Sequence, residues 1–406
     1  MDMAELTALL TPEGLRLLDD LGTVTSTDEV AAAVSRLRKA GHSPDLVSAV
    51  IGQARLRAKG AAKFGPFADR MLFTRAGLEQ ATRLGVAARH AARFRDAGFT
   101  RVADLGCGIG GDALGLAALG ITVDAVDADE VTAAIAAYNL APFGETARVR
   151  HATAEQAAED LFADGASEAA QAVWLDPARR AAGHGETART APSDWSPSLE
   201  WSFALTDRVP AGIKLGPGLD RDLLPDGGEA QWVSADGSTI ELVIWSGALA
   251  RPGIARAALV MRGDAAWELT AAADAEDEPA RELGAFLHEP DGAVIRARLI
   301  GEVARSLEAG TLDPRIAYLT GDAAVTSPFV QSFRVREVLP SDTKALGAAL
   351  RARGIGRLEI KKRGVDIDPA TLRTKLKLRG DEAATLFVTR IGSRRTTILA
   401  DRVDAA

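Results

Sequence analysis

The sequence contains a single cysteine, Cys107, among its 406 residues. One thiol excludes an internal disulfide framework and a cysteine metal cluster, so we expect no bound metal and a reducing, cytoplasmic compartment. Long hydrophobic runs are also absent, and the first five residues, MDMAE, lack the basic and then apolar plan of a signal peptide. We therefore expect no membrane span and no secretory signal.

Charge is distributed unevenly along the chain. The net charge is −8, yet residues 351–400 hold 13 Lys and Arg against 5 Asp and Glu, which leaves −16 for the remainder. A chain of this length predicts two to four domains, since one hydrophobic core rarely grows beyond roughly 250–300 residues. We expect a C-terminal unit whose basic surface suits phosphates.

The chain is organised around residues 101–112, RVADLGCGIGGD, and residues 123–129, VDAVDAD. An apolar run broken by glycines predicts a buried strand, a tight loop and then a helix. Such a loop lets the backbone approach a ligand closely, and the helix start offers N–H groups. Gly106, Gly108 and Gly111 satisfy the dinucleotide pattern G-x-G-x-x-G, and Asp127 is placed to bind a ribose, so a nicotinamide cofactor and S-adenosylmethionine both remain open.

Asp104, two residues before the first glycine, favours the second of these cofactors. With Asp127 and Asn139, it makes the chain resemble class I S-adenosylmethionine-dependent methyltransferases, whose first motif resembles D-L-G-C-G-x-G-G-D. The resemblance implies a Rossmann-like α/β core with a seven-stranded, mostly parallel sheet. It also implies that Asp104 organises the loop near the amino-acid end of the cofactor and that Asp127 holds the ribose. The implied cofactor-binding residues are Asp104, Gly106, Gly108, Gly110, Asp127, Ala128 and Ala154.

The acid that accepts the adenine amino group in this family has no clear counterpart. Thr153, Glu155 or the backbone of Ala154 are the candidates.

Strands alternate with helices from Gly98 onward, which predicts a parallel sheet with ligands at the carboxyl ends of its strands. Before this sheet, we predict a helical N-terminal unit. The signals are helix caps followed by proline at Thr11 and Ser43, a further cap at Thr74 and the helical spacing of apolar residues from 46 to 54. The predicted strands are 101–105, 122–127, 148–152, 172–176, 212–215 and 239–245.

The fourth predicted strand ends in Asp176-Pro177-Ala178-Arg179-Arg180. In base-amine methyltransferases this place carries an acid or Asn, then Pro-Pro and an aromatic residue. The resemblance implies that Asp176 and the carbonyl of Pro177 hold the amino group. The aromatic ring is missing here, and Arg179 and Arg180 are candidates for gripping a base or a phosphate.

A ribose target remains an alternative. Lys63, Asp176, Lys214 and Glu241 follow the order Lys, Asp, Lys, Glu, which resembles the tetrad of ribose 2′-O-methyltransferases. There a lysine deprotonates the sugar hydroxyl while neighbouring acids support it. Lys214 would be that base, and Lys63 is a further candidate for substrate contact.

Residues 176–180 (DPARR), 214–217 (KLGP) and 358–364 (LEIKKRG) resemble those of a group of bacterial methyltransferases. In that group, ferredoxin-like and THUMP-like domains follow the catalytic core, and the last third of this chain resembles those domains. THUMP domains bind RNA, so the resemblance implies rRNA or tRNA as partner, with Lys361, Lys362 and Arg363 as candidate contacts. Within the first of these units, a strand is expected over 292–295. The alternative is a non-catalytic RNA-binding or assembly protein that retains the methyltransferase fold.

We therefore predict an RNA methyltransferase, with a base nitrogen favoured over a ribose oxygen. The expected domains are a helical unit over residues 1–95, the catalytic core over 96–268, a ferredoxin-like domain over 280–340 and a basic THUMP-like domain over 341–406.

Overall fold

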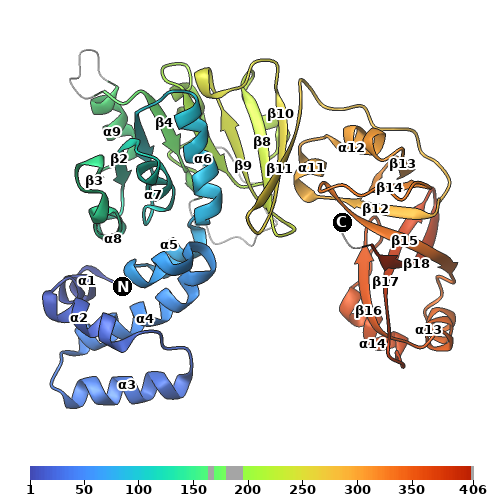
Figure 1. Cartoon of the computed structure of the whole chain (residues 1–406), viewed down its shortest axis with the longest axis horizontal. Helices are drawn as coiled ribbons and strands as arrows, with labels where there is room; N and C mark the ends of the chain where they lie inside the picture. Colours follow the sequence, from blue (N-terminus) through green and yellow to red (C-terminus); the bar gives the residue numbers. More distant parts are fainter. Residues whose placement is uncertain (163–168, 180–194, 404–406) are drawn as a thin grey trace. The chain divides into compact units, whose positions relative to one another are not determined.

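The computed structural model describes residues 1–162, 169–179 and 195–403 (Figure 1). The chain divides into two compact units. Unit 1 comprises Met1–Leu215 and Ile244–Ala250, and unit 2 comprises Gly216–Val243 and Arg251–Ala406. No helix within these described ranges is both long and apolar enough to cross a bilayer.

Helices fill the first part of unit 1. The hydroxyls of Thr11, Ser43 and Thr74 each accept a hydrogen bond from the backbone N–H three residues later, which confirms the predicted helix starts. The apolar residues predicted at helical spacing from 46 to 54 are buried. The elements are α1 (Met3–Leu9), α2 (Pro12–Leu21), α3 (Thr27–Lys39), α4 (Pro44–Phe64), η1 (Gly65–Arg70), α5 (Arg75–Gln80) and α6 (Leu84–Asp96).

A parallel sheet forms the rest of unit 1, in the order β7-β4-β1-β2-β3. Its strands are β1 (Arg101–Leu105), β2 (Thr122–Asp127), β3 (Ala147–His151), β4 (Ala172–Leu175) and β7 (Ala211–Leu215), close to the predicted ranges. The last two residues of β9 (Ser238–Trp245) lie beside β7. Its other elements are α7 (Gly111–Ala118), α8 (Glu130–Leu140), η2 (Ala141–Thr146), α9 (Ala154–Leu161), β5 (Ala178–Arg179), β6 (Trp195–Ser196), α10 (Leu199–Leu205) and η5 (Gly247–Leu249).

The core of this sheet is built on aromatic side chains. Trp174 on β4 and Trp245 on β9 are buried, with ring centroids 5.7 Å apart, and Phe94 of α6 packs edge-on against both. A Cβ atom at Gly212 would come within 2.6 Å of the Trp245 ring and 2.8 Å of the Trp174 ring. Only glycine therefore allows β7 to pass between these indoles.

Unit 2 begins with strands in the order β9-β8-β10-β11. The six strands predicted from the sequence pattern are thus present in the sheet order β3-β2-β1-β4-β7-β9, and β8, β10 and β11 extend this sheet to nine. The sequence did not predict β8, β10 or β11. Their bounds are β8 (Glu229–Ala235), β10 (Arg256–Arg262) and β11 (Ala265–Ala271), with η4 (Arg221–Leu223) before β8.

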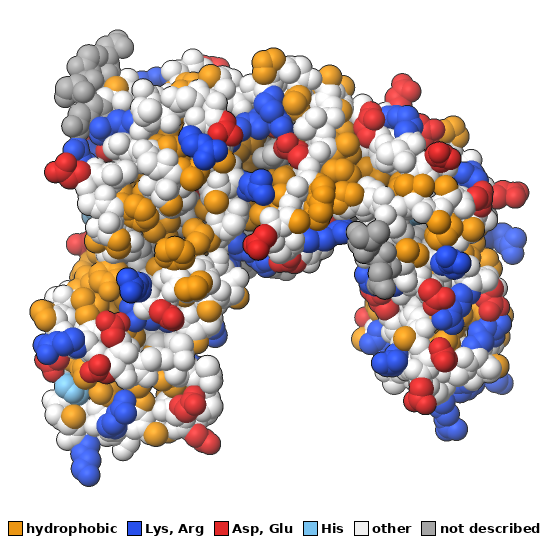
Figure 2. Space-filling model, in the orientation of Figure 1, with side chains coloured by type: hydrophobic (Ala, Val, Ile, Leu, Met, Phe, Trp, Pro, Cys, Tyr) orange, Lys and Arg blue, Asp and Glu red, His pale blue; other side chains and the backbone are white. Residues whose placement is uncertain are grey.

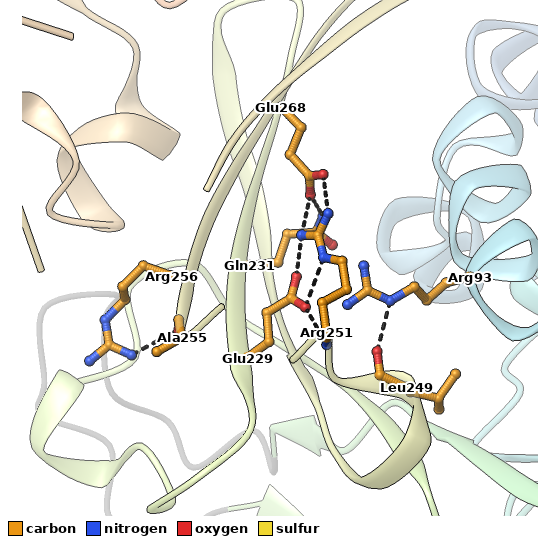
Figure 3. A network of polar contacts seen from close by, with 8 residues as sticks. All are labelled: Arg93, Glu229, Gln231, Leu249, Arg251, Ala255, Arg256 and Glu268. Carbon is orange, nitrogen blue, oxygen red and sulfur yellow. Dashed lines mark hydrogen bonds and ion pairs between the residues drawn. The ribbon is translucent and has the colours of Figure 1, made fainter. Parts of the chain in front are cut away.

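A network of ion pairs and hydrogen bonds joins β8 to β11 through Arg251 (Figure 3). The Arg251 guanidinium donates to the carboxylate of Glu229 on β8, which is fully buried, and to Glu268 on β11. Glu268 also accepts a hydrogen bond from Gln231 of β8. The network satisfies polar groups that would otherwise be costly to bury.

A second, seven-stranded sheet in unit 2 has the order β13-β14-β12-β15-β18-β17-β16. β15 pairs with both β12 and β18, so one sheet carries strands from both expected C-terminal domains, whose boundary at 340 remains a prediction. Its strands are β12 (Phe286–Pro290), β13 (Gly310–Asp313), β14 (Ile316–Gly321), β15 (Val330–Leu339), β16 (Ile355–Lys362), β17 (Glu382–Ile391) and β18 (Arg394–Arg402).

One predicted strand of this unit is wrong. Residues 292–295 lie in a helix, because the Asp291 side chain accepts a hydrogen bond from the N–H of Ala293 at 2.9 Å and so caps a helix start. The helices of this part are α11 (Gly292–Arg296), α12 (Ile300–Ser306), α13 (Thr343–Ala352) and α14 (Pro369–Leu376).

Candidate functional site

The glycine loop connects β1 to α7 at the carboxyl edge of the sheet. Gly106, Gly108 and Gly110 have φ angles of +93°, +55° and +89°, a region that glycine adopts without strain. A Cβ atom at Gly106 would lie 3.1 Å from the carbonyl oxygen of Asp176. The glycines therefore allow the sharp turn and bring the end of β4 against the loop.

Asp104 is buried at the end of β1 with only 1% of its surface exposed. Neither of its carboxyl oxygens has a hydrogen-bond partner within the described part of the chain. Burial, and then the negative charges of Asp112 and Asp176, raise the pKa of Asp104 well above its usual value. A buried carboxyl without a donor is costly, and a ligand that brings a cationic donor would relieve this cost.

Asp127 ends β2 and is tied to the loop directly. Its carboxylate accepts hydrogen bonds from the N–H of Gly108 and of Asp129, both at 2.9 Å. Burial raises the pKa of Asp127, against the opposing effect of these two donors. The carbonyl of the neighbouring Ala128 lies 3.1 Å from a ring nitrogen of His151. The strand end and the glycine loop therefore form one surface.

The candidate adenine contacts lie at the start of α9. Thr153 is its N-cap, with its hydroxyl accepting from the N–H of Gln156, and Ala154 and Glu155 form the first turn. The Thr153 hydroxyl is thus engaged locally.

Asp176 and Lys214 meet at the ends of adjacent strands, β4 and β7. Their side chains form an ion pair, and the Lys214 ammonium also donates to the hydroxyl of Thr82 at 3.0 Å. The Asp112 carboxylate lies 3.9 Å from the same ammonium. Because Asp176 directly follows Leu175, which pairs with Leu105 of β1, the ion pair sits beside the glycine loop.

Three buried residues that the sequence interpretation missed support Lys214. Asp112, in the first turn of α7, accepts a hydrogen bond from the Thr82 hydroxyl at 2.6 Å and lies 2.8 Å from Nδ1 of His90. Burial opposes its ionisation, but the His90 hydrogen bond and the Lys214 charge outweigh it and lower the pKa of Asp112 to about 2. The sequence did contain a signal for Asp112, because this acid is the last residue of the glycine motif at 101–112.

Asn139 of α8 links the helical N-terminal part to the glycine loop. Its amide exchanges two hydrogen bonds with the backbone of Leu72, at 2.8 and 3.0 Å, and donates to the carbonyl of Ile109 at 2.9 Å. The segment before α6 is therefore fixed against the loop.

Three further candidate residues are Lys63, Glu241 and Pro177. The Lys63 ammonium donates to the carbonyls of Glu79 and Ala81 at 2.7 Å each; burial and then the charge of Lys214 lower its pKa. Glu241 is buried on β9 within unit 2. Pro177 follows Asp176 and is also buried. The roles proposed for these residues remain predictions.

The candidate substrate contacts near the C-terminus are partly neutralised. Lys361 lies 2.6 Å from Glu289 and 3.4 Å from Glu359, and Lys362 donates to the carbonyl of Ile367. Arg363 instead lies over the Tyr318 ring, 5.3 Å from its centroid. On the face drawn in Figure 2, positive and negative side chains are interspersed over this part of the chain. Arg179 lies in β5, opposite Trp195, and Arg180 is outside the described residues.

Known proteins resemble this chain over most of its length. Two curated relatives from Mycobacterium tuberculosis, strains CDC 1551 / Oshkosh and ATCC 25618 / H37Rv, are each 35% identical over 373 residues. The matches cover 88% of this chain and 96% of each relative, and both relatives are named uncharacterized S-adenosylmethionine-dependent methyltransferases.

Comparisons of domains and of folds agree with this. A family described as THUMP domain-like matches residues 330–402, and a domain of unknown function, DUF8688, matches residues 2–60. The crystal structure of a presumed methyltransferase from Porphyromonas gingivalis W83 shares the fold with a TM-score of 0.72 at 20% identity. That likeness covers 94% of this chain and all of the other.

Proposed function

The chain belongs to the S-adenosylmethionine-dependent methyltransferases, and from this premise we propose that it methylates an amino nitrogen of a base in structured RNA. The observation that carries the choice of target is the Asp176 carboxylate, which is held by Lys214 beside the glycine loop. An acid in this position accepts hydrogen bonds from an exocyclic amine next to the methyl donor.

The residues at the carboxyl edge of the sheet fit the cofactor. Asp104 offers an unpartnered buried carboxyl to the cationic amino group, and Asp127 at the end of β2 is placed for the ribose hydroxyls. The positive φ angles of the loop glycines keep Cβ atoms away from this surface. S-adenosylmethionine supplies an electrophilic methyl group on a sulfonium centre.

The chain's own residues then position the acceptor. Asp176 and the carbonyl of Pro177 accept hydrogen bonds from the amine, which aligns its lone pair and favours the positive charge that develops on nitrogen. The Lys214 ammonium holds the Asp176 carboxylate in place. Formation of the N–C bond with loss of the C–S bond would leave a cationic nitrogen, and the Asp176 carboxylate that accepts its hydrogen bond would take the extra proton and pass it to solvent.

A ribose hydroxyl is the second candidate target. Lys214 lies at the carboxyl edge of the sheet, and a lysine is the base that deprotonates the hydroxyl in the ribose scheme. Its ammonium lies between Asp176 and Asp112, and two carboxylates favour the charged form rather than a free amine. This arrangement supports the base-nitrogen scheme. Near-normal turnover of Lys214→Ala would eliminate the ribose scheme.

RNA as the substrate class rests on two observations. The THUMP domain-like match covers residues 330–402, and THUMP domains bind RNA in modifying enzymes. The same region includes all of residues 351–400, where 13 Lys and Arg stand against 5 Asp and Glu. A positive excess of this kind suits a polyphosphate backbone.

The proposal is tested by mass spectrometry of nucleosides from rRNA and tRNA of a deletion strain and its parent. We expect one methylated base to disappear, and to return when purified enzyme and S-adenosylmethionine are added to RNA from the deletion strain. Unchanged nucleosides and no methyl transfer in vitro would contradict it. An absence of S-adenosylmethionine and S-adenosylhomocysteine binding by calorimetry would favour the non-catalytic scaffold.

A further inference from the structure

A pocket of about 470 Å³ in unit 2 is lined by four arginines, Arg221, Arg296, Arg298 and Arg363. They come from separate parts of the chain: η4, the end of α11 and the turn after it, and the residue after β16. We propose that this pocket binds the phosphodiester backbone of the nucleic-acid substrate. The proposal rests on the proposed function and gives it a specific docking site.

The arginines outnumber the carboxylates that they face. Asp274 is paired with Arg221 at 2.7 Å and Arg256 at 2.8 Å, and it lies 3.9 Å from Arg298. Arg363 contacts the Tyr318 ring rather than an acid. The Arg296 guanidinium forms no hydrogen bond or ion pair with any residue that the structure describes. A net positive charge therefore remains in the pocket.

Specific contacts fix two features of the pocket, the position of Arg221 and the approach of α11 to β9. Arg221 is fixed by one guanidinium nitrogen that donates to both carboxylate oxygens of Asp274, by a hydrogen bond to the Arg296 carbonyl at 2.8 Å and by its position over the Trp232 ring. A Cβ atom at Gly292 would come within 2.1 Å of the Thr239 hydroxyl, so glycine is required where α11 approaches β9. A planar guanidinium fork matches the oxygens of a phosphate.

The pocket suits phosphates rather than bases. Trp232 is only 1% exposed, and the Arg221 guanidinium covers its ring, so no aromatic face is offered for stacking. Contacts to phosphate alone predict binding that does not depend on base sequence. Pro217, whose carbonyl accepts a hydrogen bond from the Trp232 indole, follows Lys214 by three residues.

The groove around β16 is a weaker site by comparison. It holds about 710 Å³ and is lined by Arg357, Arg373 and Arg402, but also by Glu359 and Asp401. Arg402 is paired with Glu359 at 2.9 Å, so its charge is compensated.

Fluorescence anisotropy with a labelled, mixed-sequence RNA hairpin tests the pocket on the full-length protein. We choose Arg296→Ala and Arg363→Ala, because Arg221 also holds structure. We expect each to weaken binding about fivefold to tenfold, and to reduce the slope of log K against log salt by about 0.7 to 0.9 for each phosphate that the variant no longer binds. Arg296→Lys, which keeps the charge without the fork, should fall between wild type and Arg296→Ala.

Arg36→Ala, an exposed arginine of α3 outside the pocket, is the matched control and should bind RNA like wild type. S-adenosylhomocysteine binding by calorimetry should be unchanged in every variant, which shows that unit 1 remains folded. If wild type binds the hairpin and the double variant Arg296→Ala/Arg363→Ala binds it equally well, the pocket is overturned while the proposed function stands. If wild type binds no RNA, both are overturned.

Discussion

The Asp112 carboxylate lies 2.8 Å from Nδ1 of His90, and this buried pair connects α7 to α6 with the carboxylate 3.9 Å from the Lys214 ammonium. The His90 ring in turn packs against the Trp174 ring, tilted by 30°, with centroids 4.3 Å apart. Through this chain of contacts, the position of the Lys214 ammonium depends on a carboxylate that itself touches neither cofactor nor substrate in the proposed mechanism. Asp112 is therefore a positioning residue.

Replacing this acid should destabilise the protein in a pH-dependent way. The folded pKa of Asp112, about 2, lies below its ordinary value of 3.8, so ionisation stabilises the fold above about pH 4 and this contribution is lost as the pH falls toward 2. We expect Asp112→Asn to lower the free energy of unfolding by about 2 kcal/mol at pH 7. In urea unfolding, the difference from wild type should shrink between pH 4 and pH 3.

The exposed acid Asp20, replaced as Asp20→Asn, is the control and should leave the free energy of unfolding unchanged. A pH-independent effect of Asp112→Asn would contradict the ion-pair interpretation.

Replacing Asp104 should have opposite effects on stability and on cofactor binding. Its folded pKa is raised, so the folded state keeps a proton that the unfolded state loses, and stability falls as the pH rises above the ordinary value. We expect ligand-free Asp104→Asn to melt at a higher temperature than wild type at pH 7, with the difference vanishing near pH 4. S-adenosylmethionine affinity should fall about 30-fold to 100-fold, because a charge-assisted hydrogen bond is lost.

The same argument predicts proton release when the wild-type protein binds the cofactor. A cationic amino group favours ionised Asp104, so the calorimetric enthalpy should vary with the ionisation enthalpy of the buffer, and this dependence should disappear in Asp104→Asn. Equal cofactor affinity of variant and wild type would refute the assigned role.

Removing Arg251 should test the ion-pair network in unit 2. Glu229 is fully buried, so Arg251→Ala leaves its carboxylate without the guanidinium, and we expect a loss of about 3 kcal/mol in the free energy of unfolding. Urea unfolding of the full chain measures it. Adding Glu229→Gln removes the uncompensated charge and should recover part of the loss; a double variant less stable than Arg251→Ala would argue against this explanation.

Burial along its whole length explains why the sequence did not reveal β8. In β8 every residue is buried, including Glu229, Gln231 and Ser234, so no alternation of polar and apolar positions marks the strand. By contrast, β1 and β2 are apolar runs that end in glycine or acid signals, and the structure has them at the predicted residues.

Side-chain partners were harder to predict than strands. Asp127 and Asp176 were identified at the ends of predicted strands, and Asp104 by its place two residues before the first glycine of the loop. The supporting contacts of Asp112 come from Thr82 and His90, which lie 30 and 22 residues earlier on the helical segment, a separation that no local pattern encodes. Likewise, the partial neutralisation of Lys361 depends on Glu289, 72 residues away.

Asn139 provides the last test, because it fixes the helical segment to the glycine loop. It is 4% exposed, and its three hydrogen bonds satisfy the buried N–H and carbonyl of Leu72 and the carbonyl of Ile109. Asn139→Ala leaves these groups without a partner, which should cost about 2–3 kcal/mol in the free energy of unfolding.

Cofactor binding by Asn139→Ala also distinguishes a role of Asn139 in anchoring the glycine loop from a general effect on the stability of the fold. Because Ile109 lies within the loop, its release should weaken S-adenosylhomocysteine binding, measured by calorimetry well below the melting temperature. Arg251→Ala, which destabilises unit 2 by a similar amount, is the matched control and should bind the cofactor normally. If both variants lose affinity equally, the effect reflects stability alone and Asn139 does not anchor the loop.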